Sequence, residues 1–405
     1  MTMIPEILSP AGDMERLQAA LLYGADAVYL AGSAFGMRTA PQNFDNDTLR
    51  CAVDLVHKAD KRVYVACNIL PRNEDMQALP AYLEFLAEIQ PDALIVADLG
   101  VIALAKKYAP DIPLHISTQL GVVNYHTANA LYEMGAKRVV LARELSLTEI
   151  KEIRAHTPHE LELEAFVHGA MCMSVSGRCI ISNYMTGRDA NRGECTQPCR
   201  WSYNIIEPHR PDKPMTVTET ENGTYLFNAH DMNMIEHIGE LADAGISSFK
   251  IEGRAKAAYY AAVTAYAYRA AVDGYVAVGC PKTYTPPKWV VDELNKVSHR
   301  PYSTGFYFGM PHQDTTVGGY IREYAVAGIV EGYADGKLLI EQRNRFFCGD
   351  KLEVISPANE PFMLTVKTLF DGEGNAIDCA PHAAMKLQIP YEKALPKGSI
   401  LRCKL

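Results

Sequence analysis

Short apolar runs rich in β-branched residues alternate with longer amphipathic stretches from the start of the chain to about residue 252. A short apolar run is typical of a buried strand, and apolar residues at three- and four-residue spacing are typical of a helix that packs on one face. Strands are predicted at residues 5–9, 26–30, 62–66, 92–96, 113–116, 138–142, 162–167 and 248–251. Helices are predicted at residues 14–23, 47–59, 79–89, 101–108, 125–134, 147–156 and 255–273.

This alternation of strands and helices with short connections predicts parallel strands joined by right-handed crossovers. Eight such units in roughly 275 residues fit a closed (β/α)8 TIM-like barrel, a fold that typically takes about 250 residues. Periodicity carries no information on closure, so an open doubly wound sheet is the structural alternative. The predicted first domain is therefore a TIM-like barrel over residues 1–275.

The alternation fails once, after the seventh strand, where residues 169–225 are rich in Gly, Ser, Asn, Arg and Cys. This insertion contains Cys172, Cys179, Cys195 and Cys199 with the spacing C-x6-C-x15-C-x3-C. Four soft thiolates in one loop fit an Fe–S cluster or zinc, and the lack of the tight C-x2-C pairs of zinc ribbons favours the cluster. The alternative is that these four are scattered buried thiols, as we expect of the remaining cysteines. Because loops after strands build the active site of a TIM-like barrel, we expect the chemistry here.

The pattern of hydrophobic and polar residues changes after the barrel. Residues 276–319 form a predicted connector, with a helix near 291–297. Beyond it, alternating runs at 324–330, 337–342, 351–355 and 362–368 are separated by turn signals such as Asp335-Gly336 and Asp371-Gly372. Residues 320–405 are therefore predicted to form a small C-terminal β-barrel domain.

Composition and charge narrow the functional classes. The 405 residues include 39 Lys and Arg, 48 Asp and Glu, and 48% hydrophobic residues, which describes a globular protein large enough for two domains. The chain has no apolar run of about 18 residues and no basic start followed by an apolar stretch, so we expect no membrane association and a cytoplasmic location. A net charge of -9 argues against non-specific nucleic-acid binding, although it leaves a local basic surface open.

Polar residues at the carboxyl ends of barrel strands point into the mouth of the barrel. On this basis the candidate substrate-binding residues are Asn68, Asp98, Gln119, Arg143 and Glu144. The candidate catalytic residues are His168, Glu252 and Arg254. His168 stands out because it lies between the seventh strand and the first cysteine, where an imidazole can move a proton near neutral pH. For each of these residues the alternative is a helix cap or an ion pair across the rim.

Three segments carry a family resemblance. They are Glu164–Cys172 (EAFVHGAMC), followed by Gly177 and Cys179; Leu8–Gly12 (LSPAG), followed by Gly24–Tyr29 (GADAVY); and Phe249–Arg254 (FKIEGR). Together they resemble the collagenase-like peptidase family of unassigned catalytic type, and the resemblance covers the barrel and the connector. Despite the family name, the resemblance implies oxygen-independent hydroxylation with a [4Fe–4S] cluster, held in this chain by Cys172, Cys179, Cys195 and Cys199.

Branches of that family act on the wobble uridine of tRNA with prephenate, on a ribosomal RNA cytidine, and on the ubiquinone ring. The segment Cys195–Trp201 (CTQPCRW) and the trailing β-domain make this chain most similar to the tRNA uridine branch. Prephenate is a dicarboxylate, so we expect cationic residues to bind it, with Arg143, Arg178, Arg188 and Arg254 as the candidates. The tRNA anticodon loop offers unstacked bases, and Tyr184, Trp201 and Tyr203 either stack on them or form the local core of the insertion.

Two other functional classes stay open. The family name suggests a peptidase, yet the sequence has no His-Glu-x-x-His pair and no Gly-x-Ser-x-Gly elbow. Catalytic triads are spatial, so this absence is not decisive. The second class is a non-catalytic protein that lends its cluster to a homologous partner subunit.

Hydroxylation of a uridine carbon is a net oxidation, and a cluster accepts electrons where ordinary side chains do not.

Overall fold

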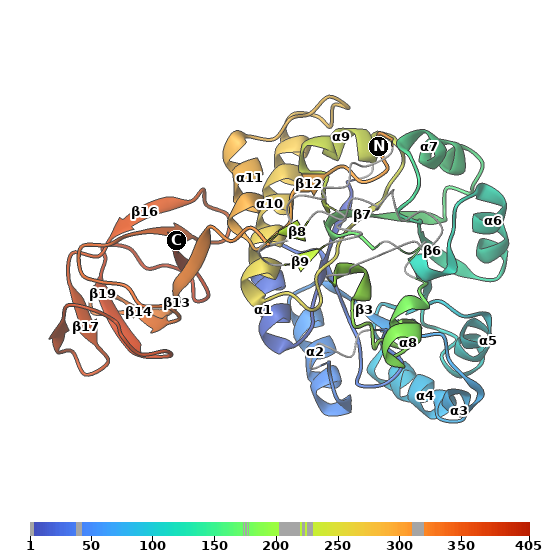
Figure 1. The fold of residues 1–405 in the computed structure, drawn as a ribbon, viewed down its shortest axis with the longest axis horizontal. Helices are drawn as coiled ribbons and strands as arrows, with labels where there is room; N and C mark the ends of the chain where they lie inside the picture. The colour runs from blue at the N-terminus through green and yellow to red at the C-terminus, as the bar shows by residue number, and fades with distance from the viewer. Residues whose placement is uncertain are drawn as a thin grey trace.

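The N-terminal part of the chain folds into a closed barrel of parallel strands. The computed structural model describes residues 4–37, 43–172, 174, 176, 178–201, 219–220, 223–224, 230–309 and 320–405. The barrel strands are β1 (Glu6–Pro10), β2 (Ala27–Leu30), β3 (Arg62–Cys67), β4 (Ala93–Val96), β5 (Leu114–Ile116), β6 (Ala136–Val140), β7 (Glu162–Ala170) and β11 (Ser248–Ile251). They pair in this order, and β11 pairs in parallel with both β7 and β1 (Figure 1). This closure confirms the TIM-like barrel and excludes the open sheet.

Helices surround the barrel and cover the outward faces of its strands (Figure 1). They are α1 (Met14–Leu22), α2 (Asn46–Lys58), α3 (Asn73–Met76), α4 (Leu79–Ile89), α5 (Leu99–Tyr108), α6 (Tyr125–Glu133), α7 (Leu147–Ala155), α9 (Ile238–Asp243) and α10 (Ala258–Ala277). Local sequence defines where several of them begin: Ser146 and Glu149 form a capping box at α7, and Asp45 caps α2. No helix in the described part of the chain has both the length and the apolar character needed to cross a membrane.

Elements that the sequence did not predict follow β7. They are α8 (Ile181–Thr186), β8 (Glu219–Thr220), β9 (Gly223–Thr224) and β10 (Asp231–Asn233), and α9 follows directly. Strand β10 pairs antiparallel with the end of β7, and β12 (Tyr302–Ser303) pairs with β10. Strands β10 and β12 therefore extend the sheet beyond the end of β7.

The C-terminal part forms a separate antiparallel sheet. Its strands are β13 (Tyr324–Ala334), β14 (Lys337–Gln342), β15 (Lys351–Ile355), β16 (Phe362–Thr365), β17 (Leu369–Asp371), β18 (Ala376–Ile377), β19 (Lys386–Pro390) and β20 (Ile400–Lys404). The sheet curls around its own apolar core, and Figure 1 shows it beside the barrel, on the side of α1, α10 and α11 (Lys288–Glu293). The small β-domain predicted for the end of the chain is thus present.

Candidate functional site

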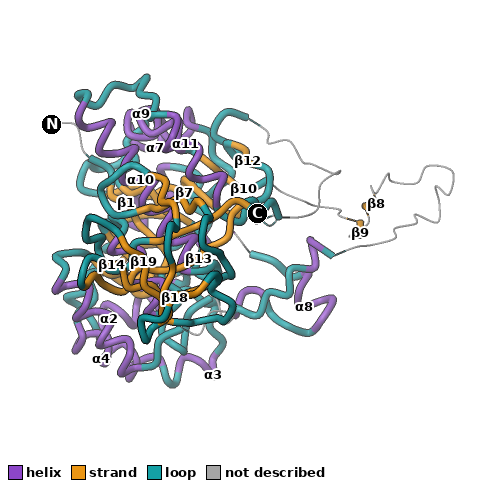
Figure 2. Tube along the Cα trace, turned by 90° about the vertical axis from the view of Figure 1, so that its left-hand side faces the viewer, coloured by secondary structure: helices purple, strands orange, loops and turns teal. Residues whose placement is uncertain are grey.

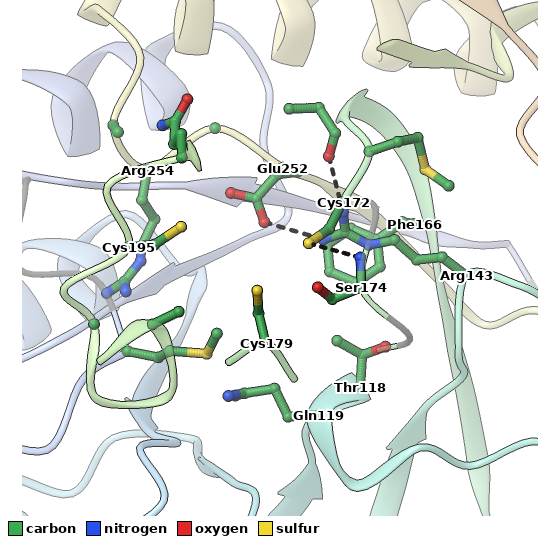
Figure 3. Close-up of a pocket in the computed structure, with 18 of the residues that line it drawn as sticks. Thr118, Gln119, Arg143, Phe166, Cys172, Ser174, Cys179, Cys195, Glu252 and Arg254 are labelled. Carbon is green, nitrogen blue, oxygen red and sulfur yellow. Dashed lines mark hydrogen bonds and ion pairs between the residues drawn. The ribbon is translucent and has the colours of Figure 1, made fainter. Parts of the chain in front are cut away.

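A cavity of about 830 Å³ opens at the carboxyl ends of the barrel strands, and all four cysteines of the insertion line it. Figure 3 shows Cys172, Cys179 and Cys195 pointing into this cavity from different sides. Six further predicted residues also line it: Asn68, Gln119, Arg143, Glu144, Glu252 and Arg254. The structure therefore brings together the predicted cluster ligands and most of the predicted substrate residues.

The cysteine-bearing insertion is tied to the barrel by specific hydrogen bonds. Glu144 Oε1 accepts from the backbone N–H of Ser176 at 2.9 Å. The side chain of Asn191 accepts from the N–H of Cys179 at 3.2 Å and donates to its carbonyl at 3.0 Å. Arg192 forms an ion pair with Asp75 of α3, with Nη2 and Oδ1 3.0 Å apart. These contacts hold the insertion over the cavity.

Part of the insertion faces solvent instead. Figure 2 shows α8 extending out from the barrel. The side chain of Tyr184 on this helix is 85% exposed, and both Arg178 and Arg188 are exposed and lie outside the cavity lining. The structure therefore does not bring Arg178 and Arg188 into the cavity with the other candidates, and their predicted role in substrate binding stays a prediction. Tyr184 is not part of a local core, Trp201 is 38% exposed, and Tyr203 lies outside the described residues.

The charges in the cavity wall are mostly positive. The described lining residues include the cations Arg143, Lys250, Arg254, Lys256 and Arg322, against the carboxylates Glu144 and Glu252. A wall with this excess of cations suits an anionic ligand.

Three of these cations, Lys250, Lys256 and Arg322, were not among the predicted site residues. The sequence does contain a signal for Lys250: it is a lysine within an apolar strand, and such a lysine needs a buried partner. That partner is Glu164, whose Oε1 lies 2.6 Å from Lys250 Nζ. Burial alone would raise the pKa of Glu164, but Lys250 and Arg138 hold it below its usual range. Lys256 follows a strand end, whereas Arg322 arrives from beyond the connector and had no local signal.

Arg143 and Glu252 connect the ends of three strands. Arg143 Nη2 lies 3.3 Å from Glu252 Oε2, and Arg143 Nη1 donates to the carbonyl of Ala170 at 2.8 Å. The guanidinium also lies over the ring of Phe166, 3.8 Å from its centroid. Figure 3 shows these two side chains next to each other. These contacts hold both charged groups at the cavity wall with little freedom to rotate.

Two glycines allow the loop after β11 to carry Glu252 and Arg254 into the cavity wall. A Cβ atom at Gly12 would lie 2.1 Å from the carbonyl oxygen of Arg254. A Cβ atom at Gly169 would lie 2.4 Å from the carbonyl oxygen of Glu252, and Gly169 has a φ of +104°. Only glycine fits at such close approaches, which explains the glycines in two of the family-like segments.

His168 does not line the cavity, so its predicted place at the site is wrong. It is 1% exposed and packs against the rings of Tyr260, Tyr268 and Tyr302, and burial lowers its pKa to about 3. The cause is an irregularity in β7: Phe166 pairs with Lys250, but His168 pairs with the next residue, Ile251. The extra residue turns His168 toward the helices instead of the cavity.

Asp98 is also outside the cavity lining. Its carboxylate caps α5 by accepting from the backbone N–H groups of Gly100 at 2.8 Å and Val101 at 3.1 Å. For Asp98 the capping alternative holds, since both hydrogen bonds satisfy N–H groups at a helix start.

The donor set at the cavity fits a sulfur-ligated group. The four cysteine thiols are soft donors, and Fe–S clusters and thiophilic metals prefer soft donors. Within the described ranges, no three His, Cys, Asp or Glu side chains are placed so that they could hold a single metal ion.

Similarity to known proteins agrees with the predicted family. The description "Peptidase family U32" matches residues 12–317, and "Peptidase family U32 C-terminal domain" matches residues 322–402. The chain is 35% identical to "tRNA hydroxylation protein P1" of Bacillus subtilis over 403 residues, covering 98% of this chain and 94% of that protein. It is 35% identical to "tRNA hydroxylation protein P" of Escherichia coli over 437 residues, covering 96% and 94%.

A third relative is named for ribosomal RNA and not for tRNA. The "23S rRNA 5-hydroxycytidine C2501 synthase" of Escherichia coli is 36% identical over 272 residues, covering 67% of this chain and 40% of that protein. The matches extend over both the barrel and the C-terminal sheet. The chain belongs to the peptidase U32 family.

Proposed function

We propose that this protein is an RNA-modifying enzyme that hydroxylates the wobble uridine of tRNA to 5-hydroxyuridine, without oxygen, using an Fe–S cluster and prephenate. The observation that carries the proposal is the convergence of four cysteines and a cationic wall on one barrel cavity. Its support from similarity is that relatives matching most of the chain are named tRNA hydroxylation proteins.

The four cysteines are the proposed ligands of a [4Fe–4S] cluster. Each iron of such a cluster takes one thiolate, so its ligands surround it from several sides of a cavity. When bound, the cluster supplies the electron-transfer capacity that replacing a C5–H bond by C5–OH requires. The chain's own contribution is to position the cysteine-bearing loop through the contacts of Ser176 with Glu144 and of Cys179 with Asn191.

Prephenate is the proposed co-substrate because it carries two carboxylates. Arg143 and Arg254 line the cavity, and so does Lys250, whose ammonium is paired with Glu164. Guanidinium groups bind carboxylates through paired hydrogen bonds, and a fixed guanidinium such as that of Arg143 orients the ligand.

The proposed partner is the anticodon loop of tRNA, and we expect the enzyme to act in the cytoplasm. The exposed Tyr184 and the exposed Arg178 and Arg188 offer an aromatic ring and two cations outside the cavity. Unpaired bases stack on aromatic rings and their phosphates attract cations, so these residues suit RNA better than the interior.

One alternative has a specific observation in its favour, namely hydroxylation of ribosomal RNA, because one relative is named a 5-hydroxycytidine synthase. The peptidase alternative has less support: the described residues that line the cavity include no histidine to activate a nucleophile.

The test is mass spectrometry of bulk tRNA from anaerobically grown cells that lack the gene. The expected result is loss of 5-hydroxyuridine derivatives, restored by the wild type and not by Cys172→Ala. Persistence of the modification in the deletion strain, with no second family member present, would contradict the tRNA proposal. The ribosomal RNA from the same cells is then examined for 5-hydroxycytidine.

A further inference from the structure

The side-chain NH2 group of Gln119 is buried, and no described residue accepts a hydrogen bond from it. The side chain lines the cavity and is 2% exposed. Its Nε2 atom has no hydrogen-bond partner among the residues that the structure describes. Figure 3 shows Gln119 at the cavity wall near Cys179. A buried N–H donor without a partner is costly, which points to a ligand atom that accepts from it.

The orientation of this amide is determined by a chain of hydrogen bonds. The backbone N–H of Met37 can only donate, and it donates to Asn68 Oδ1 at 3.2 Å. The other end of the Asn68 amide is therefore the donor, and it donates to Gln119 Oε1 at 2.7 Å. Ser117 Oγ donates to the same oxygen at 3.2 Å. Because Gln119 Oε1 accepts from both, the N–H groups of Gln119 are the ones left for a ligand.

The surroundings of Gln119 indicate what kind of ligand fits. Ala66 and Ile95 pair with each other on β3 and β4, at the level just below Asn68, and both line the cavity. This apolar wall accommodates a flat ring, while the amide is an uncharged donor beside it. Such a donor recognises an acceptor oxygen on a ring-bearing ligand, leaving carboxylates to the cations elsewhere in the wall.

We propose that Gln119 donates a hydrogen bond to an acceptor oxygen of the bound substrate, and that Asn68 is the positioning residue that orients Gln119. The acceptor oxygen belongs either to prephenate or to the target base, and the inference rests on the proposed function for the identity of these ligands. Hydrogen bonds to a buried, pre-oriented donor give specificity because an unmatched ligand leaves the donor unpaired.

The test is direct binding to the anaerobically purified protein. One arm titrates prephenate by calorimetry, and the other titrates a labelled RNA stem-loop with a loop uridine by fluorescence anisotropy. Gln119→Met removes the donor at nearly constant volume. It is expected to weaken one of the two ligands about ten- to a hundredfold, and the ligand that weakens is the source of the acceptor oxygen.

Asn68→Asp tests the orientation. A carboxylate at position 68 cannot donate, so the Gln119 amide has to turn its N–H toward Asp and its oxygen toward the ligand. The same ligand should weaken about ten- to a hundredfold. In a Gln119→Met background, Asn68→Asp should weaken binding less than it does in the wild type, because the part of its effect that acts through Gln119 is gone and only the repulsion between the new carboxylate and an anionic ligand is left. A purely structural role of Asn68 would instead add its cost in both backgrounds.

The controls are matched substitutions at exposed positions, Gln18→Met on α1 and Asn295→Asp after α11, which should leave both dissociation constants unchanged. Unchanged binding of both ligands by Gln119→Met would overturn the inference while leaving the proposed function intact. If the wild type binds neither prephenate nor the RNA stem-loop, the proposed function is overturned and this inference falls with it.

Discussion

The cysteines at the cavity differ from the other cysteines in what surrounds them. Cys172, Cys179 and Cys195 point into the cavity, whereas Cys51 is an exposed residue of helix α2. Cys67 is buried in strand β3 and does not line the cavity, and burial raises the pKa of its thiol to about 12, which disfavours the thiolate. Location in the fold, and not residue type, therefore separates proposed ligands from bystanders.

Replacing Cys179 by Ala is predicted to remove the proposed cluster and the proposed hydroxylation activity together, because a four-thiolate site would lose one of its ligands. Iron and sulfide content of anaerobically purified protein, with the visible absorption spectrum, measures the first effect. Cys51→Ala is the matched control and should keep full iron content. Full iron content in the Cys179 variant would show that this residue is not a ligand.

His168 gives the protein a predicted dependence of stability on pH. Burial lowers its pKa from 6.5 to about 3, and Asp231 opposes this shift while His299 and Lys256 add to it. Below pH 6.5 the unfolded chain binds a proton at this site that the folded protein does not, so folding stability is lost as the pH falls toward 3. The loss is about 1.4 kcal/mol per pH unit, or about 2 kcal/mol at pH 5.

Urea denaturation at pH 7 and pH 5 measures this effect against His168→Gln, which does not titrate. The difference in the free energy of unfolding between the two pH values should be about 2 kcal/mol smaller in the variant. Equal pH dependence in both proteins would mean that His168 is accessible to protons in the folded state.

At the scale of elements, the sequence predicts the barrel strands well because each is a short apolar run buried on both faces. All eight predicted runs overlap observed strands. Strand β10 and helix α9 were missed, since the short run of Asp231–Asn233 becomes a strand only by pairing with β7. The place of His168 was missed for a related reason: the irregularity between β7 and β11 is a property of the pairing, and strand alternation alone puts His168 on the face of Phe166.

The candidate site divides in the same way. The cysteines and the polar residues at strand ends were predictable, because the barrel places such positions at one mouth. The presence of Arg322 at the cavity was not predictable, because this residue reaches the cavity from beyond the connector. The orientation of Gln119 was not either, because it depends on the backbone of Met37, far along the chain.

The loop after β11 provides a prediction at this scale. Gly12→Ala puts a methyl group 2.1 Å from the carbonyl oxygen of Arg254, so the backbone that carries Glu252 and Arg254 must shift. We expect at least a tenfold loss of affinity for prephenate, the proposed co-substrate, because a displaced guanidinium would no longer match a carboxylate of that ligand. Calorimetric titration measures it, with Gly332→Ala as the control, since a Cβ there meets nothing closer than 3.7 Å. Unchanged affinity would show that this loop does not take part in ligand binding.

At the scale of the whole molecule, the barrel and the C-terminal sheet are joined by buried polar contacts. The hydroxyl of Tyr23, the C-cap residue of α1, lies 3.1 Å from the carbonyl oxygens of both Ile355 and Gly398, which share its one hydrogen. Arg402 of β20 lies 2.6 Å from both Glu293 and Glu353, and Lys296 lies 2.7 Å and 2.9 Å from the same two carboxylates. Two cations thus balance two carboxylates across the contact between the domains.

The balance of these four charges makes Arg402 a sensitive position. Arg402 and Glu293 are both fully buried, with 0% of their side chains exposed. In Arg402→Leu, Lys296 alone faces two carboxylates, and one buried negative charge is left without compensation. We expect the free energy of unfolding to fall by about 3–5 kcal/mol, as for other buried pairs that lose one partner.

Urea denaturation followed by circular dichroism measures this loss, with Lys288→Ala as the control. Lys288 pairs with Asp292 at the surface, four residues along α11, where such a pair contributes only about 0.5 kcal/mol. Adding Glu293→Gln to Arg402→Leu removes the surplus charge, so the double variant should be more stable than Arg402→Leu alone. If the double variant is instead less stable, the cost of losing Arg402 comes from packing, and the charge balance does not hold the two domains together.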